Sequence, residues 1–322
     1  MTHRFRYAFT AFVCMLAAGS AFAQGYPARA VRVLVPFSAG GTVDIVARIV
    51  GAKLASDLGQ PFLVENKPGA GGTIAAVQLA KSPGDGYTLM MMSQALAYSA
   101  SLYPDLPYDT LRDLAPIAFV GATPNALVIT HLLPVRTVQE FLAYARANPG
   151  RIAYGSAGVG SAGHLAVELL QSLTGIRLTH VPYKGNAPVL TDLIGGQIQV
   201  SLLTMPSVMP YVKGGKVRAL ATSGSRRSPA LPEVPTIAEA GVPGYEYTPW
   251  YGMFGPGTLP KELIARLNAA VNKALAEARL GEKLAQQGLE VHAMASDQFR
   301  EIVRGDVARW GKIIRELGIR GE

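Results

Sequence analysis

Residues 31–44 read VRVLVPFSAGGTVD, an apolar β-rich run followed by a Gly-rich turn and the start of a helix. Gly40 and Gly41 let the backbone come close to a ligand. The helix start at Thr42 offers backbone N–H groups without partners, and its positive dipole end favours an anion. An ordinary turn, in which Thr42 or Asp44 only caps the helix, is the alternative. The stretch predicts a strand–turn–helix unit with a candidate anion site.

The same pattern returns along the chain, where apolar β-rich runs end in Gly-rich turns that open helices. The runs cover residues 31–36, 62–65, 88–92, 117–120, 152–155, 178–183, 198–203 and 217–222. This alternation predicts an α/β protein with parallel-rich sheets flanked by helices. Because 322 residues are too many for one small domain, two lobes are expected.

Helix boundaries are also visible in the sequence. Thr137 with Glu140 and Thr236 with Glu239 have the spacing of capping boxes, and Gly59 is expected to end the helix that starts near Thr42. Periodic apolar residues after positions 260 and 296 predict long helices that pack one face on a sheet.

The stretch 223–244, rich in Pro, Gly and Ser, predicts a return linker between lobes, and an outgoing crossing is expected near residues 121–125. Residues 24–123 and 245–322 would then form an N-terminal lobe completed by the C-terminal helices. Residues 124–244 would form a central inserted lobe.

The N-terminus has the pattern of an export signal. Arg4 and Arg6 precede an apolar stretch over residues 7–18, and an Ala-Phe-Ala triplet ends at Ala23. We expect cleavage after Ala23 and a periplasmic protein. Cys14, the single cysteine, lies in the segment to be removed, which excludes disulfides and Cys-ligated metals from the mature chain.

The formal net charge is +8, and loss of Arg4 and Arg6 leaves +8 − 2 = +6. This balance suits an anionic ligand. The basic residues are dispersed and do not form a stripe with aromatic residues between them. Nucleic acid is therefore not an expected partner.

Two further Gly-rich segments follow strands. Residues 66–73 read NKPGAGGT and residues 154–164 read YGSAGVGSAGH. Gly158, Gly160 and Gly163 match the G-x-G-x-x-G fingerprint of dinucleotide-binding enzymes. That fingerprint also needs an acidic residue about 20 positions later, where this chain reads VPYKG. An anion site made of backbone N–H groups and serine hydroxyls needs fewer assumptions, but a secreted enzyme that binds a nucleotide or ester through this loop remains the alternative.

Other catalytic and metal motifs are missing. The sequence has no G-x-S-x-G elbow, and the histidines have no metal-binding spacing. His164 alone lies next to a candidate site, and a lone histidine at a helix start is more often structural than a base. We expect no catalytic residue, no metal and no cofactor.

Taken in order, these segments resemble one family. The further motifs that carry the resemblance are residues 85–89 (DGYTL), 181–185 (VPYKG), 227–229 (RSP), 231–232 (LP), 234–241 (VPTIAEAG) and 250–252 (WYG). The chain resembles the Bug family of extracytoplasmic solute-binding proteins, the receptors associated with tripartite tricarboxylate transporters.

The resemblance implies a type II periplasmic-binding-protein fold, in which two lobes close like a Venus flytrap on one small ligand, without catalysis. It also implies that a carboxylate is held between residues 37–44 and residues 156–161. The receptor would deliver its ligand to membrane components of a transporter or to a sensor kinase, and we expect a monomer.

Selectivity is expected from side chains around this anchor. Many members of the family carry acidic residues on the strand before the Pro-Ser turn, whereas residues 199–207 of this chain read QVSLLTMPS, with Gln199, Leu203 and Thr204 as the positions that could set selectivity. An apolar wall would leave a buried ammonium group unpaired, which is costly. We therefore expect a mono-, di- or tricarboxylate or an aromatic carboxylate in preference to an amino acid. Alternatively, these positions lie behind the cleft and affect only packing.

The candidate ligand-binding residues belong to the Gly-rich loops and neighbouring strand ends. They are Phe37, Ser38, Ala39, Gly40, Gly41, Thr42, Asp44, Gly71, Ser93, Ser156, Gly158, Gly160, Ser161, His164, Lys184, Leu203 and Thr204.

Overall fold

The computed structural model describes residues 25–103, 105–286 and 288–319. The expected export signal and its cleavage site after Ala23 lie outside these ranges. Within them, no helix combines the length and apolar character needed to cross a bilayer.

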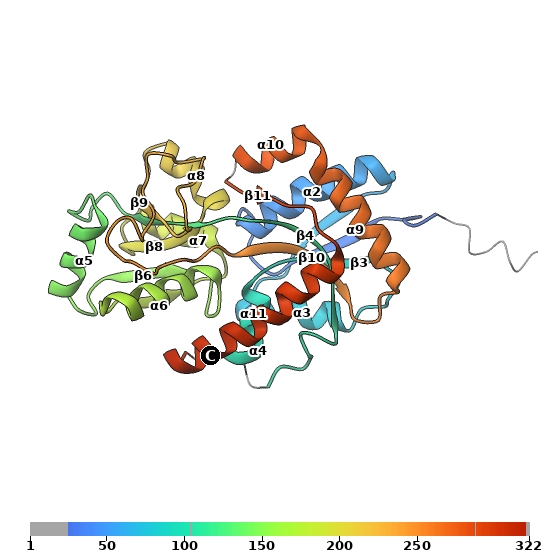
Figure 1. Ribbon diagram of the computed structural model, residues 1–322, viewed down its shortest axis with the longest axis horizontal. Helices are drawn as coiled ribbons and strands as arrows, with labels where there is room; N and C mark the ends of the chain where they lie inside the picture. Colours follow the sequence, from blue (N-terminus) through green and yellow to red (C-terminus); the bar gives the residue numbers. More distant parts are fainter. Residues whose placement is uncertain (1–24, 104, 287, 320–322) are drawn as a thin grey trace, which may run out of the picture.

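The chain alternates strands and helices (Figure 1). The strands are β1 (Val31–Val35), β2 (Phe62–Asn66), β3 (Thr88–Ser93), β4 (Leu114–Ala122), β5 (Asn125–Ile129), β6 (Ala153–Ser156), β7 (Thr179–Pro182), β8 (Val200–Thr204), β9 (Arg218–Thr222), β10 (Trp250–Pro256) and β11 (Glu290–Val291). The α-helices are α2 (Thr42–Leu58), α3 (Thr73–Ala80), α4 (Ala95–Leu102), α5 (Val138–Ala147), α6 (Ala162–Thr174), α7 (Asn186–Ile194), α8 (Met205–Lys213), α9 (Lys261–Ala276), α10 (Ala278–Gln286) and α11 (Ser296–Leu317). A short 3₁₀ turn, η2 (Ala70–Gly72), precedes α3.

The strands form two sheets, one in each lobe (Figure 1). The six-stranded sheet has the order β11-β4-β10-β3-β1-β2, and the five-stranded sheet has the order β7-β6-β8-β5-β9. Neighbours β2, β1 and β3 are parallel, as are β7, β6 and β8. In contrast, β10 is antiparallel to β3 and β4, and β5 is antiparallel to β8 and β9. Both sheets are therefore mixed, because the strands that carry the chain between lobes run against their neighbours.

The expected α/β class with two lobes and flanking helices is confirmed. The first sheet takes strands from residues 31–122 and from residues after 249, whereas the second sheet uses only residues 125–222. The boundaries expected at 123/124 and 244/245 stay predictions.

Local helix signals have mixed outcomes. Gly59 ends α2 in the left-handed conformation, with φ of 72°, as expected. Thr137 caps α5 by accepting the N–H of Glu140. The side chains of Thr236 and Glu239 each accept the backbone N–H of the other residue, as in a capping box. However, the segment forms only a turn, so the prediction of a helix there is wrong. Gly241, with φ of 99°, diverts the backbone immediately afterwards.

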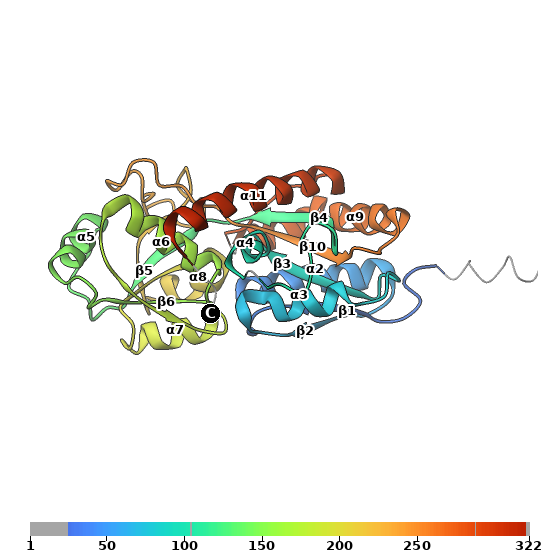
Figure 2. The same cartoon turned by 90° about the horizontal axis from the view of Figure 1, so that it is seen from below.

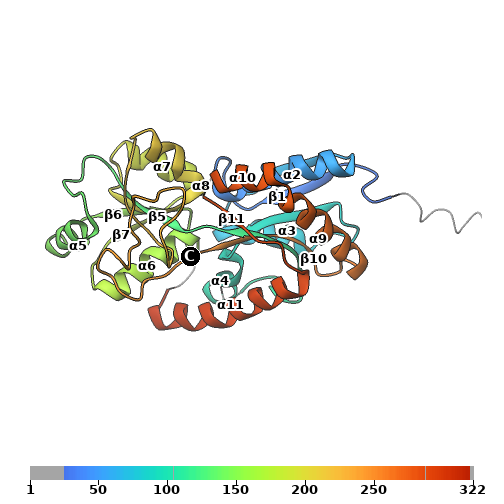
Figure 3. The same cartoon turned by 45° about the horizontal axis from the view of Figure 1, so that its top comes forward.

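Helix α11 lies along one side of the first lobe, across α4, and its C-terminal end extends towards the second lobe (Figures 2 and 3). Fully buried Phe299 anchors it with its ring centroid 5.1 Å from Trp250, 5.3 Å from Phe254 and 5.7 Å from Phe119. This aromatic cluster attaches a segment distant in sequence to the sheet that carries β1 and β3.

Candidate functional site

A cavity lies between the lobes, at the carboxyl ends of β1, β3, β6 and β8. It holds about 370 Å³ of space between protein atoms, its open mouth included. Its lining residues are Phe37, Gly41, Thr42, Val43, Ser93, Ala157, Ser161, Ala162, Gly163, Asn186, Thr204 and Tyr251. Because parallel strands end at the same sheet edge, helices that follow them start around this cavity.

The first helix to start there is α2. Its N-cap is Gly41, in an extended conformation, and no side chain caps it. The first helical bond joins the N–H of Ile45 to the carbonyl of Gly41 at 2.9 Å. The N–H groups of Thr42 and Val43 therefore have no helical partner at the cavity wall. The alternative in which Thr42 or Asp44 caps this helix is not what the structure shows.

Asp44 instead fixes the turn before the helix. Its carboxylate accepts the N–H of Gly40 at 2.9 Å, an amide N–H of Asn66 at 3.0 Å and two bonds from Arg48 at 2.9 and 3.0 Å. Burial alone would raise the pKa of Asp44, but these hydrogen bonds outweigh burial and lower it. The charge of Asp44 is thus neutralised locally.

Helix α6 starts on the opposite side of the cavity. Its N-cap, Ser161, accepts the N–H of His164 at 3.4 Å. The N–H groups of Ala162 and Gly163 remain without a helical partner, and both residues line the cavity. Two helix N-termini, one from each lobe, therefore meet at one space.

Hydroxyl groups link the lobes beside these helices. Thr42 Oγ1 and Thr204 Oγ1 are hydrogen-bonded across the cavity, from α2 to the end of β8. Asn186 Nδ2 donates to Thr204 Oγ1 and to Ser207 Oγ, both at 3.0 Å. A second bridge joins the N–H of Ser38 to the carbonyl of Lys184 at 3.0 Å. The lobes are thus in contact around the cavity.

Tyr251 lines the cavity from β10. Its side chain is buried, and burial raises the pKa of its hydroxyl, while hydrogen bonding with Thr204 and Thr42 acts against this. The hydroxyl is therefore a neutral donor at physiological pH.

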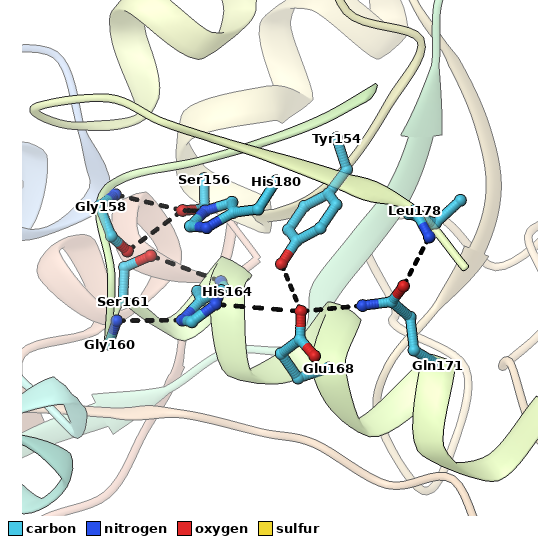
Figure 4. A network of polar contacts seen from close by, with 10 residues as sticks. All are labelled: Tyr154, Ser156, Gly158, Gly160, Ser161, His164, Glu168, Gln171, Leu178 and His180. Carbon is cyan, nitrogen blue, oxygen red and sulfur yellow. Dashed lines mark hydrogen bonds and ion pairs between the residues drawn. The ribbon is translucent and has the colours of Figure 1, made fainter. Parts of the chain in front are cut away.

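Another polar network lies inside the second lobe, behind the loop from β6 to α6 (Figure 4). Ser156 Oγ lies 2.6 Å from His180 Nε2 and accepts the N–H of Gly158 at 3.2 Å. His164 Nδ1 accepts the N–H of Gly160 at 3.1 Å. The N–H groups of Gly158 and Gly160 are thus used inside the lobe.

The two histidine rings are stacked, with centroids 4.3 Å apart. Burial and, to a smaller extent, the neighbouring His180 lower the pKa of His164 to about 3. Burial lowers the pKa of His180 to about 4. Glu168 lies beyond His164, with its Oε1 3.9 Å from His164 Nε2, and accepts the hydroxyl of Tyr154 at 2.5 Å. Both rings are neutral supports of the loop.

The candidate residues divide into three groups. Those that line the cavity are Phe37, Gly41, Thr42, Ser93, Ser161 and Thr204. A second, neighbouring cavity is lined by Phe37, Gly71, Gly158 and Lys184. Those that line neither are Ser38, Ala39, Gly40, Asp44, Ser156, Gly160, His164 and Leu203.

The positions expected to set selectivity separate in the same way. Leu203 is buried in the apolar core of the second lobe, whereas Thr204, the next residue of β8, faces the cavity. Gln199 precedes β8, at the opposite end of this strand from Thr204, and its amide oxygen accepts the N–H of Ala153. For Leu203 and Gln199, the structure therefore favours the packing alternative.

Two lining residues, Val43 and Ala157, lie inside the predicted loops 37–44 and 156–161 but were not among the candidates. Four others lie outside these loops: Ala162, Gly163, Asn186 and Tyr251. Asn186 follows the Gly185 turn at the start of α7, so a polar residue at a helix start was an available signal. Tyr251 belongs to the 250–252 motif, but that motif does not place it at the cavity, because its position depends on the pairing of β10 with β3. Among the described residues, no cluster of His, Cys, Asp or Glu could hold a metal ion.

Known proteins resemble the chain over nearly all of its length. The sequence model of a family described as tripartite tricarboxylate transporter family receptor matches residues 46–319. Protein BugT of Bordetella pertussis is 40% identical over 299 residues, covering 92% of this chain and 91% of BugT.

Two solved structures from Rhodopseudomonas palustris have the same fold. Rpa4515 with adipate has a TM-score of 0.89 and 38% identity, and the match covers 92% of this chain and 99% of that one. MatC (Rpa3494) with bound malate has a TM-score of 0.86 and 34% identity, and the match covers 90% of this chain and 100% of that one.

Proposed function

This chain belongs to the tripartite tricarboxylate transporter receptor family, as its Bug-type sequence motifs indicated, and we propose that its interlobe cavity binds a small organic carboxylate. Members of this family are periplasmic solute-binding receptors, not enzymes. The alternative of a nucleotide- or ester-binding enzyme is therefore wrong. The G-x-G-x-x-G match has a structural cause, because Gly158 and Gly160 have positive φ angles of 120° and 76°, and a β-carbon on Gly163 would lie 2.7 Å from the carbonyl oxygen of Leu202.

The observation that carries the proposal is the meeting of α2 and α6 at one cavity. Each helix offers backbone N–H groups and a positive dipole end, at residues 42–43 and 162–163. In the described part of the chain, no residue that lines this cavity is charged. In a space closed from water, such fixed dipoles stabilise an anion more strongly than they would in bulk solvent.

The same lining supports a ligand without an amino group. The nearest buried carboxylate, Asp44, is already occupied by Arg48 and Asn66. An ammonium group would have only uncharged oxygens as partners, from hydroxyl groups, the backbone and the amide of Asn186, which is a costly environment for a buried charge. Adipate and malate, bound in two related structures, also lack an amino group.

The wider role follows from the family. We propose that the chain is exported, cleaved after Ala23 and active as a periplasmic monomer. It would deliver its ligand to membrane components of a tripartite transporter or to a sensor kinase.

A thermal-shift screen of the mature chain, beginning at Gln24, tests the proposal. The panel contains organic acids, nucleotides and two matched pairs: succinate with aspartate, and glutarate with glutamate. We expect organic acids to raise the melting temperature and nucleotides to leave it unchanged. A shift with nucleotides alone would refute carboxylate binding, and larger shifts with the amino acids than with their matched diacids would refute the argument about the ammonium group.

A further inference from the structure

A second cavity adjoins the first and shares two of its walls, Phe37 and Ala157. It holds about 840 Å³ between protein atoms, open mouth included. Its other lining residues come from the second Gly-rich loop and from the central lobe: Gly69, Ala70, Gly71, Gly72, Tyr103, Gly158, Val159, Pro182, Tyr183 and Lys184. The two cavities therefore meet at Phe37 and Ala157.

Both lobes contribute to this second cavity, and their loops approach closely around it. A β-carbon on Gly71 would lie 2.7 Å from the carbonyl oxygen of Val159, so only glycine permits this approach. The N–H of Ser38 reaches across the lobes to the carbonyl of Lys184 at 3.0 Å. Contacts between the lobes thus border the second cavity, as they border the first.

Lys184 is the only charged residue among the described residues that line either cavity. Its side chain is exposed, and it forms no ion pair with a carboxylate in the described part of the chain. Asp44, the acidic residue of the neighbouring loop, has Arg48 as its own partner. The cation of Lys184 is therefore available to a ligand.

We propose that the second cavity is a separate compartment of the binding site, in which Lys184 attracts a second anionic group at the far end of the ligand. This inference rests on the proposed function, since it assumes that one carboxylate occupies the helix N-termini of the first cavity. The preferred ligand then has two anionic groups joined by a spacer that passes Phe37 and Ala157. The two groups are recognised differently, one by neutral backbone donors and the other by a lysine.

Isothermal titration calorimetry with adipate and monomethyl adipate tests this assignment, because the ester has the same carbon chain and lacks only the second charge. A hydrogen bond to a charged group is worth enough to make adipate bind about tenfold more tightly than its ester. We expect Lys184→Met to bring this ratio close to one and Lys184→Arg, which keeps the charge, to restore it. Lys216→Met is the matched control, since Lys216 is an exposed lysine of the same lobe that lines neither cavity.

Each outcome decides the question. An unchanged ratio in Lys184→Met would overturn the role of Lys184, and equal affinities of the natural protein for adipate and its ester would overturn the second compartment. Both results leave the proposed function intact, because a carboxylate is still bound. If the natural protein binds neither compound and no acid of the thermal-shift panel, the proposed function and this inference are both refuted.

Discussion

The stacked pair His164 and His180 makes the stability of this protein depend on pH above the range in which carboxylates titrate. Folding lowers the pKa of the rings from 6.5 to about 3 and about 4. The unfolded chain therefore binds more protons than the folded chain as the pH falls below 6.5. The stabilisation is complete above pH 6.5 and is lost progressively between pH 6.5 and the folded values.

The size of the loss follows from the unfolded pKa. Both folded rings are still neutral at pH 5.0, whereas an unfolded imidazole is almost fully protonated there. Protonation of the unfolded state therefore lowers the free energy of unfolding between pH 7.5 and 5.0. The decrease is about 2 kcal/mol per ring, or about 4 kcal/mol for the pair. The result is insensitive to the folded values as long as they lie well below 5.

Urea unfolding of the mature chain at pH 7.5, 6.5, 5.5 and 5.0, followed by tryptophan fluorescence, measures this loss. The double variant His164→Gln/His180→Gln cannot take up these protons, and its free energy of unfolding should change by less than about 1 kcal/mol over the same range. The reasoning is refuted if the natural protein is equally stable at pH 7.5 and 5.0, or if the double variant loses as much stability as the natural protein.

Three substitutions extend the test. Thr204→Val removes the hydroxyl that links β8 to Thr42 of α2, so calorimetry should show carboxylate affinity weakened by about 1–2 kcal/mol, and unchanged affinity would contradict the interlobe link. Gly41→Val places a side chain at the cavity wall, where its β-carbon would lie 3.4 Å from the nearest heavy atom. Carboxylate binding should be lost while the circular dichroism spectrum stays unchanged, and retained binding would show that the anion lies elsewhere. Phe299→Ala removes the central ring of the aromatic cluster and should lower the free energy of unfolding by about 3–5 kcal/mol. Ile302→Ala, at a half-exposed position of the same helix, should lower it by less than about 1 kcal/mol, and similar losses in the two variants would contradict the anchoring role of Phe299.

Local patterns carried most of the fold prediction. The expected run 31–36 agrees with β1 to within one residue, and the expected start at Thr42 agrees with that of α2. Here strand, Gly-rich turn and helix follow from neighbouring residues, so no distant contact is needed. In contrast, β10 has two glycines and no alternation, and its place between β3 and β4 is fixed by pairing across more than 100 positions.

The candidate site shows the same limit. The sequence indicated the loops 37–44 and 156–161 but not which backbone N–H groups face the ligand. That choice depends on His164 and Ser156, whose side chains take up the N–H groups of Gly160 and Gly158. Similarly, only the register of β8 against β5 decides that Thr204 faces the cavity and Leu203 the core.

A crystal structure of the mature protein with adipate tests the central claim most directly. We predict one carboxylate of the ligand within hydrogen-bond distance of backbone N–H groups at residues 42–43 of α2 and 162–163 of α6. The second carboxylate should lie in the neighbouring compartment near Lys184. Adipate bound outside the interlobe cavity, or held there by side chains with both helix N-termini unoccupied, would contradict the account.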